Sequence, residues 1–132
     1  MRTRTKARQR AVEALYEANL RSVPVLEIFD RNPATNEYAC VIAQLAQENA
    51  DRIDEVLNTY SQGWSVQRMP AVDKAIMQIA VAELLYQPEV ETAIIISEAI
   101  EIAGILSAAE SGKFINGILG QVAQIRTSIS EL

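Results

Sequence analysis

The sequence predicts an all-α fold of about seven helices in one domain over residues 1–132. Three observations lead to this prediction: apolar residues recur at helical spacing between the prolines and glycines, no segment is a clear strand, and aliphatic residues supply the core. Hydrophobic residues make up 49% of the chain and aromatic residues only 5%. A chain of this length and composition can bury the core of one ordinary domain.

Seven segments have the helical pattern, and they cover about residues 4–21, 24–29, 36–61, 65–69, 71–87, 93–106 and 111–126. We expect Thr3 or Thr5 to cap the first helix, and Pro24 fits the first turn of the second. Gly63 is expected to end the third segment. Asn49 is a polar residue on the apolar stripe of that segment, so it marks a bend or a break.

The segment at 71–87 is apolar on nearly all sides, which predicts a helix in the middle of the fold. Glu83 lies inside this segment. An isolated buried charge is strongly unfavourable, so a buried carboxylate needs a partner. We therefore expect Glu83 to be buried, paired and structural, with an arginine of the first helix as its partner.

The residue types needed for common enzyme chemistry are missing. The sequence has no histidine, which is the commonest general base and metal ligand. It also has neither GxxxxGKS nor GxGxxG, the glycine-rich motifs that bind phosphate groups. Asp51, Asp54 and Glu55 are close in sequence, but with Arg52 they form the solvated face of a helix. We expect no catalytic residue, no cofactor and no metal.

Cys40 is the only cysteine, which excludes an intramolecular disulfide and favours a reducing compartment such as the cytoplasm. Its place in a helical segment predicts a small packing residue rather than a nucleophile. No apolar run approaches the roughly 20 residues of a membrane-spanning helix. The N-terminus carries charges rather than a secretory signal.

The charge of the chain is unevenly distributed. Its net charge is −5, yet Arg2, Arg4, Lys6, Arg8 and Arg10 lie within the first twelve residues, where there is no acid. The remaining residues hold 7 basic and 17 acidic side chains. Because charges act over about 10 Å at ordinary salt, a local basic arm on an acidic body can attract a polyanion. The alternative is a solvated terminus that only improves solubility.

On a helix, the basic residues of this arm fall on two sides. Arg10 can pair with Glu13, three residues later, and Lys6 lies on the same side. Arg4 and Arg8 fall in line with the apolar stripe, and no acid of their own helix neutralises them. We expect these two guanidinium groups to be unpaired and presented to a partner such as RNA.

The start of the last helix is a second candidate site. Lys113 and the free backbone N–H groups of the first turn could bind a phosphate. Phe114 either stacks on a base or anchors the helix in the core. Gly117 and Gly120 each cost about 1 kcal/mol in a helix relative to alanine, so they indicate close helix packing or close approach of a ligand.

Four segments, taken in this order along the chain, resemble the NusB family. They are RQRAVEALY at 8–16, GWSVQRMPAVDKAIMQIA at 63–80, SEAIEIA at 97–103 and KFINGILG at 113–120. The resemblance implies two small helical bundles packed across each other, here about 1–62 and 63–132. It also implies a transcription antitermination factor, which binds boxA-type single-stranded RNA together with NusE, a small-subunit ribosomal protein. The complex joins RNA polymerase and suppresses termination, notably in ribosomal RNA transcription.

In this family the arginine-rich first helix contacts RNA, and a tyrosine of that helix and the loop before the last helix also belong to the site. Phe114 is added because its ring could stack on a base. The candidate RNA-binding residues are therefore Arg4, Lys6, Arg8, Arg10, Tyr16, Lys113 and Phe114. The chain departs from the family pattern at Glu91, Ser97 and Gly104. Gly104 stands in place of a lysine, which makes the expected RNA face less basic.

Two other classes of function remain open at this point. One is a helical protein-interaction module with this fold and weak or no RNA binding. The other is a fragment of an enzyme, since a similar domain precedes the catalytic domain of certain rRNA methyltransferases, although the chain is short for that and carries no cofactor motif. The sequence also leaves open whether the protein is a monomer or a homodimer.

Overall fold

The computed structural model describes residues 2–33, 36–61 and 65–126. Every regular element in these residues is helical, which confirms the predicted all-α class. In chain order the elements are α1 (Thr3–Arg21), α2 (Val25–Arg31), α3 (Glu37–Glu48), α4 (Ala50–Tyr60), the 3-10 turn η1 (Val66–Arg68), α5 (Ala71–Tyr86), α6 (Thr92–Leu106) and α7 (Ser111–Val122).

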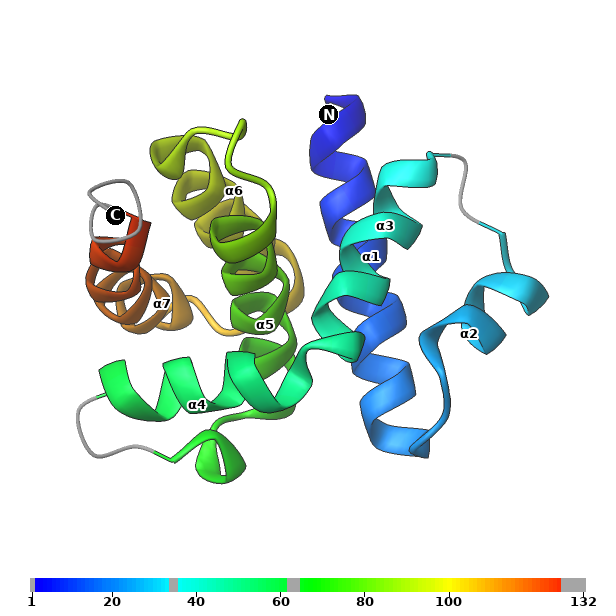
Figure 1. The fold of residues 1–132 in the computed structure, drawn as a ribbon, viewed down its shortest axis with the longest axis horizontal. Coiled ribbons are helices and arrows are strands. Elements are labelled where there is room, and N and C mark those ends of the chain that lie inside the picture. Colours follow the sequence, from blue (N-terminus) through cyan, green and yellow to red (C-terminus); the bar gives the residue numbers. More distant parts are fainter. Residues whose placement is uncertain (1, 34–35, 62–64, 127–132) are drawn as a thin grey trace.

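Helix α5 lies in the centre of the molecule, as its apolar sequence predicts (Figure 1). It packs against α1 and α3 on one side and against α6 and α7 on the other. Eleven of its sixteen residues are buried. Because α5 contacts α1 and α3 as well as α6 and α7, a helix that is bound to α5 is also placed relative to the other helices.

Helix α4 packs with the later helices of the chain rather than with the first three. Helices α1, α2 and α3 pack together, whereas α4 packs against α5 and α7 (Figure 1). The buried face of α4 consists of Ile53, Val56 and Leu57. The chain changes direction at Asn49, where α3 ends and the side-chain amide donates to the carbonyl of Leu45 at 2.8 Å. The division into sub-bundles of about 1–62 and 63–132 remains a prediction.

Some of the expected helix ends differ from those in the structure. Arg2, not a threonine, occupies the N-cap of α1 and makes no side-chain cap bond, while Thr5 is buried inside the helix. Helix α1 ends at Ser22, whose left-handed backbone (φ 54°) returns its N–H to the carbonyl of Ala18. Gly63, which was expected to end the third segment, lies outside the described residues.

The end of α5 is capped by an arginine that follows the last helix. The guanidinium of Arg126 donates to the carbonyl oxygens of Glu83 (3.0 Å), Leu84 (2.9 Å) and Gln87 (2.8 Å), and also to that of Val90. These carbonyls belong to the final turn of α5 and the loop after it, where a helix leaves carbonyl groups without helical partners. Those of Glu83 and Gln87 also accept backbone N–H groups, from Gln87 and Val90. A cation at a helix C-terminus is also favoured by the helix dipole.

Within the part of the chain that the structure describes, no helix is long and apolar enough to cross a membrane.

Candidate nucleic-acid interface

A cluster of buried charges lies where the N-terminal half of α1 meets α5 and α6. Arg8 is 4% exposed, Glu83 1% and Glu98 3%. Nε and Nη2 of Arg8 donate to the two carboxylate oxygens of Glu83 at 2.8 and 2.9 Å, and Nη1 donates to Glu98 at 2.9 Å. One guanidinium thus joins three helices. The expectation that Glu83 is buried and paired with an arginine of the first helix is confirmed.

Two hydroxyl groups complete the hydrogen bonding of these carboxylates. The hydroxyl of Tyr38, on α3, donates to Glu83 at 2.8 Å, and that of Thr5 lies 2.7 and 2.9 Å from the oxygens of Glu98. Burial, together with the charge and hydrogen bond of Glu83, raises the pKa of Tyr38. Burial lowers the pKa of Arg8, but the hydrogen bond and charge of Glu83, with Glu98 adding, outweigh it and raise that pKa.

The expectation that Arg8 presents an unpaired guanidinium to a partner is wrong. Arg8 lies in line with the apolar stripe of α1, so packing turns it inward, onto acids of two other helices. Arg4, one turn earlier, is exposed, and its guanidinium carbon lies 3.7 Å from the centroid of the Tyr38 ring. Within the described residues no hydrogen bond or ion pair engages the Arg4 side chain, in agreement with the expectation for that residue.

Arg10 has other partners than the one expected. Its Nη2 donates to the backbone carbonyl of Asn32 at 2.8 Å, and its guanidinium carbon lies 5.1 Å from the centroid of the Phe29 ring. The pair with Glu13 does not form, because Arg10 turns toward α2. Arg10 therefore links α1 to the connection between α2 and α3.

A groove of about 480 Å³ lies between α1 and this connection. Its lining residues are Thr3, Lys6, Ala7, Arg10, Asn32, Pro33, Asn36 and Ala39. Lys6 is exposed there, and Arg10 supplies a second positive charge. Ala39 lines the groove, and the ring of its neighbour Tyr38 contacts Arg4. Arg4, Lys6 and Arg10, in the N-terminal half of α1, therefore lie around one end of the molecule. Cations beside amide groups suit a phosphate and a base edge.

Tyr16 lies in a different groove, of about 430 Å³, two to three turns further along α1. Its lining residues are Val12, Glu13, Tyr16, Glu17, Leu20, Val72 and Leu106, none of which is basic. Leu20 is 61% exposed at the edge of this groove. Glu17 is shared by Arg21 and Arg31 at 2.9 and 3.0 Å, whereas no ion pair engages Glu13 among the residues that the structure describes. An apolar groove with carboxylates at its edge suits a protein surface better than RNA.

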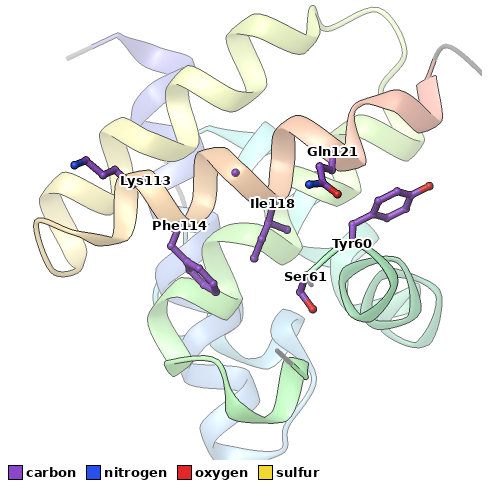
Figure 2. Close-up of a pocket in the computed structure, with 7 residues that line it drawn as sticks. Tyr60, Ser61, Lys113, Phe114, Ile118 and Gln121 are labelled. Carbon is purple, nitrogen blue, oxygen red and sulfur yellow. The ribbon is translucent and has the colours of Figure 1, made fainter. Parts of the chain in front are cut away.

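Lys113 and Phe114 lie on α7 at the edge of a third groove, of about 330 Å³, between α7 and the end of α4. Figure 2 shows Phe114 and Ile118 on one wall, Tyr60 and Ser61 on the other, and Lys113 at the far end. Phe114 is half-buried and packs against the core, so its ring has an anchoring role as well as a face toward the groove.

The glycines of α7 do not mark close helix packing. A Cβ atom added at Gly117 or Gly120 would meet no atom within 4 Å. The close-packing explanation is therefore wrong for both residues. Gly117 lines the groove of Phe114, so approach of a ligand remains the explanation at that residue.

The predicted site residues do not form one cluster. The cations of the first helix lie near Glu83, whereas Ser111, which opens α7, hydrogen-bonds with Asp73 at 3.0 Å. Asp73 and Glu83 are ten residues apart on α5, which corresponds to about 15 Å. A ligand that contacts both Arg4 and Lys113 must therefore run along the length of the central helix.

Two contributors to this region, Glu98 and Tyr38, were missed in the sequence. Glu98 falls between Ile95 and Ile102 on the apolar stripe of α6, which is the same signal that identified Glu83. Tyr38 lies two residues after the N-cap Asn36, whose side chain accepts the N–H of Tyr38 at 2.9 Å. No sequence signal showed that its ring would meet Arg4, because that contact depends on how α1 and α3 pack.

The described residues form an all-helical fold, and Arg4, Lys6 and Arg10 place three positive charges at the N-terminal end of its first helix. These features define a helical protein with a basic surface that suits a polyanion. The chain matches the model of the NusB family over residues 5–124, and it belongs to that family. Its similarity extends to curated relatives named transcription antitermination protein NusB, a name that describes a transcription factor and not an enzyme. The relative from Kineococcus radiotolerans is 42% identical over 98% of this chain and 99% of its own length, and that from Thermobifida fusca is 43% identical over 97% and 94%.

Solved structures of this fold agree with the family assignment. T. maritima NusB is 30% identical, with a TM-score of 0.84 and full coverage of both chains. A chain from a complex of the antitermination factors NusB and NusE with double-stranded RNA has a TM-score of 0.82 over 95% of this chain and 98% of its own. At 24% identity this second likeness concerns the fold.

Proposed function

We propose that the protein is a transcription antitermination factor that binds boxA-type single-stranded RNA together with NusE, in support of ribosomal RNA transcription. The observation that carries the proposal is the exposed, cation-lined end of α1 in a chain whose relatives share the name of this factor. We place its work in the cytoplasm, at the RNA polymerase complex.

The RNA contacts are assigned to Arg4, Lys6 and Arg10. Arg4 and Lys6 are exposed, and Arg10 and Lys6 line one groove. Because the rest of the chain is strongly acidic, RNA is attracted to this end and repelled elsewhere. Arg8 supports the site from beneath, since it holds α1 on α5 and α6.

Lys113 and Phe114 provide a second point of contact for a strand that runs along the molecule. Lys113 is exposed, and the groove beside Phe114 is open enough for a base. A base on an aromatic ring contributes about 1–3 kcal/mol to binding of single strands.

The groove around Tyr16 is assigned to the protein partner, NusE. Its floor is apolar, Leu20 is exposed at its edge, and no cation lines it. Leu20→Gln should therefore weaken the association with NusE and leave the weak RNA binding of the chain alone unchanged. Loss of RNA binding by this variant in the absence of NusE would contradict the assignment.

The test titrates labelled boxA-type RNA with the protein, with and without NusE, and compares the same RNA as a duplex with its complement. The chain alone should bind weakly, and NusE should strengthen the binding. A variant with Arg4→Gln and Lys6→Gln should lose most of the affinity. The control with Arg52→Gln and Arg68→Gln removes equal charge from exposed residues far from the N-terminal end of α1. Equal affinity of the two double variants would favour the alternative of a protein-interaction module.

A further inference from the structure

The Arg4 guanidinium lies against the face of the Tyr38 ring at the N-terminal end of the molecule. Its central carbon is 3.7 Å from the ring centroid, which is the distance of direct stacking. The ring belongs to α3, so the contact joins the first residues of α1 to a helix of the same bundle. Arg8 lies near the same ring, at 5.8 Å from its centroid.

The ring itself is held in place from the interior. The hydroxyl of Tyr38 donates to the buried carboxylate of Glu83 at 2.8 Å, and that carboxylate is in turn held by Arg8. The N–H of Tyr38 donates to the side chain of Asn36, which fixes the start of α3. The surface on which Arg4 rests is therefore part of the rigid core of the fold.

A stack on an aromatic face leaves the donors of an arginine free. The five N–H groups of a guanidinium lie in its own plane, whereas the ring interacts with its flat face. Within the described residues no carboxylate or carbonyl accepts from Arg4. Arg2 differs, because its guanidinium lies 3.7 Å from Glu98 and 3.9 Å from Glu101, which offset its charge.

We propose that Tyr38 is a positioning residue for RNA binding: its ring holds the guanidinium of Arg4 so that all its donors face a phosphate or a base. The inference rests on the proposed function and adds a residue from α3 to it. A long side chain loses rotamer freedom when it binds, and an aromatic support removes part of that loss before RNA arrives.

The test separates the ring of Tyr38 from its hydroxyl. Both Tyr38→Phe and Tyr38→Leu remove the hydrogen bond to Glu83, but only the leucine variant removes the aromatic face. With NusE present, Tyr38→Leu should bind boxA-type RNA about two- to fivefold more weakly than Tyr38→Phe, which is the range expected for an exposed cation–π contact. Circular dichroism melts of both variants check that each is folded at the temperature of the titration.

Combining the substitutions with Arg4→Gln then identifies the route of the effect. If Tyr38 acts through Arg4, Tyr38→Leu and Tyr38→Phe bind equally well once Arg4 is replaced by glutamine. The proposal is overturned if leucine and phenylalanine are equivalent when Arg4 is present, or if their difference persists when it is absent. Failure of the proposed function has another sign: in that case the unsubstituted protein does not bind the RNA with NusE, and both proposals fall together.

Discussion

Arg8 of α1 and Glu83 of α5 form a buried, two-pronged ion pair, with N–O distances of 2.8 and 2.9 Å. The pair lies directly beneath the exposed cations of α1. Arg8, one of five N-terminal basic residues, therefore anchors α1 to the core instead of being available to bind a ligand. The stability of the fold and the geometry of the RNA-binding end are therefore linked at this pair.

Removing one partner of this pair should destabilise the protein strongly. Arg8→Ala leaves the buried carboxylate of Glu83 without its cation, and leaves Glu98 only the exposed Arg2 at 3.7 Å. Glu83→Ala leaves the Arg8 guanidinium short of its main acceptor. Each change should lower the free energy of unfolding by about 3–5 kcal/mol. Arg8→Glu should prevent folding, because it places a third carboxylate in the same buried cluster. Urea unfolding followed by circular dichroism measures the effect.

Glu17→Ala is the matched control for the buried pair. Glu17 also joins two arginines, Arg21 and Arg31, but all three side chains are exposed. Its loss should change the free energy of unfolding far less than the loss of Glu83 does, because solvent screens exposed ion pairs. Similar effects for Glu17→Ala and Glu83→Ala would show that the buried cluster does not hold α1 in place.

The phenol of Tyr38 should make the protein less stable at alkaline pH. Its pKa is raised in the folded state, by burial first and then by Glu83, so the folded state holds the phenolic proton more tightly than the unfolded state. This contribution is complete below the ordinary phenol pKa of about 10, and it falls as the pH rises above that value, by at most about 1.4 kcal/mol per pH unit.

Tyr38→Phe provides the reference for this titration, since it keeps the ring and removes the ionisable group. The difference in unfolding free energy between the original protein and Tyr38→Phe should be nearly constant below about pH 10 and should shrink as the pH rises from about 10 to about 11. A constant difference over this range would mean that the phenol and Glu83 are not coupled.

Arg126 should contribute to stability through the carbonyls that it caps. Arg126→Gln removes donors from the last turn of α5 and leaves part-buried carbonyl oxygens short of partners, so it should destabilise by about 1–3 kcal/mol. The control is Arg21→Gln, at the exposed end of α1, which should have the smaller effect in the same thermal melts. Equal melting temperatures of the two variants would contradict the capping role.

Alanine substitutions at two glycines of α7 separate an effect on stability from an effect on RNA binding. Gly117→Ala and Gly120→Ala should each stabilise the protein by up to about 1 kcal/mol, because both sites are helical and open. Only Gly117 lines the groove beside Phe114, so only Gly117→Ala should weaken RNA binding. Equal RNA affinities of the two variants would exclude this groove from the interface.

Much of the fold could be predicted from the sequence. Helical periodicity identified the helical segments, although 36–61 divides into α3 and α4 and the segment at 65–69 is the 3-10 turn η1. The all-apolar segment identified α5 as central, and Asn49 marked the break between α3 and α4. Glu83 was recognised as buried and paired, because an unpaired charge inside an apolar helix would have a large desolvation cost. These inferences depend on the pattern of one segment at a time.

The parts that sequence reasoning missed depend on contacts between distant segments. A helical wheel places Arg8 beside the apolar stripe, but it does not show that Glu83 and Glu98 reach that point from two other helices. For the same reason the wheel paired Arg10 with Glu13, whereas tertiary packing turned it toward Asn32. Lys113 and the N-terminal cations are separated by the length of α5. A short sequence motif does not predict the distance between two such sites.

The dependence of RNA affinity on salt tests the central claim most directly. Each phosphate contact that a side chain makes to a single strand contributes about 0.7 to the slope of log affinity against log salt. With NusE present, the variant with Arg4→Gln and Lys6→Gln should therefore have a slope shallower by about 1.4 than the original protein. The control with Arg52→Gln and Arg68→Gln should keep the original slope. An unchanged slope in the first variant would show that the end of α1 does not bind the RNA backbone.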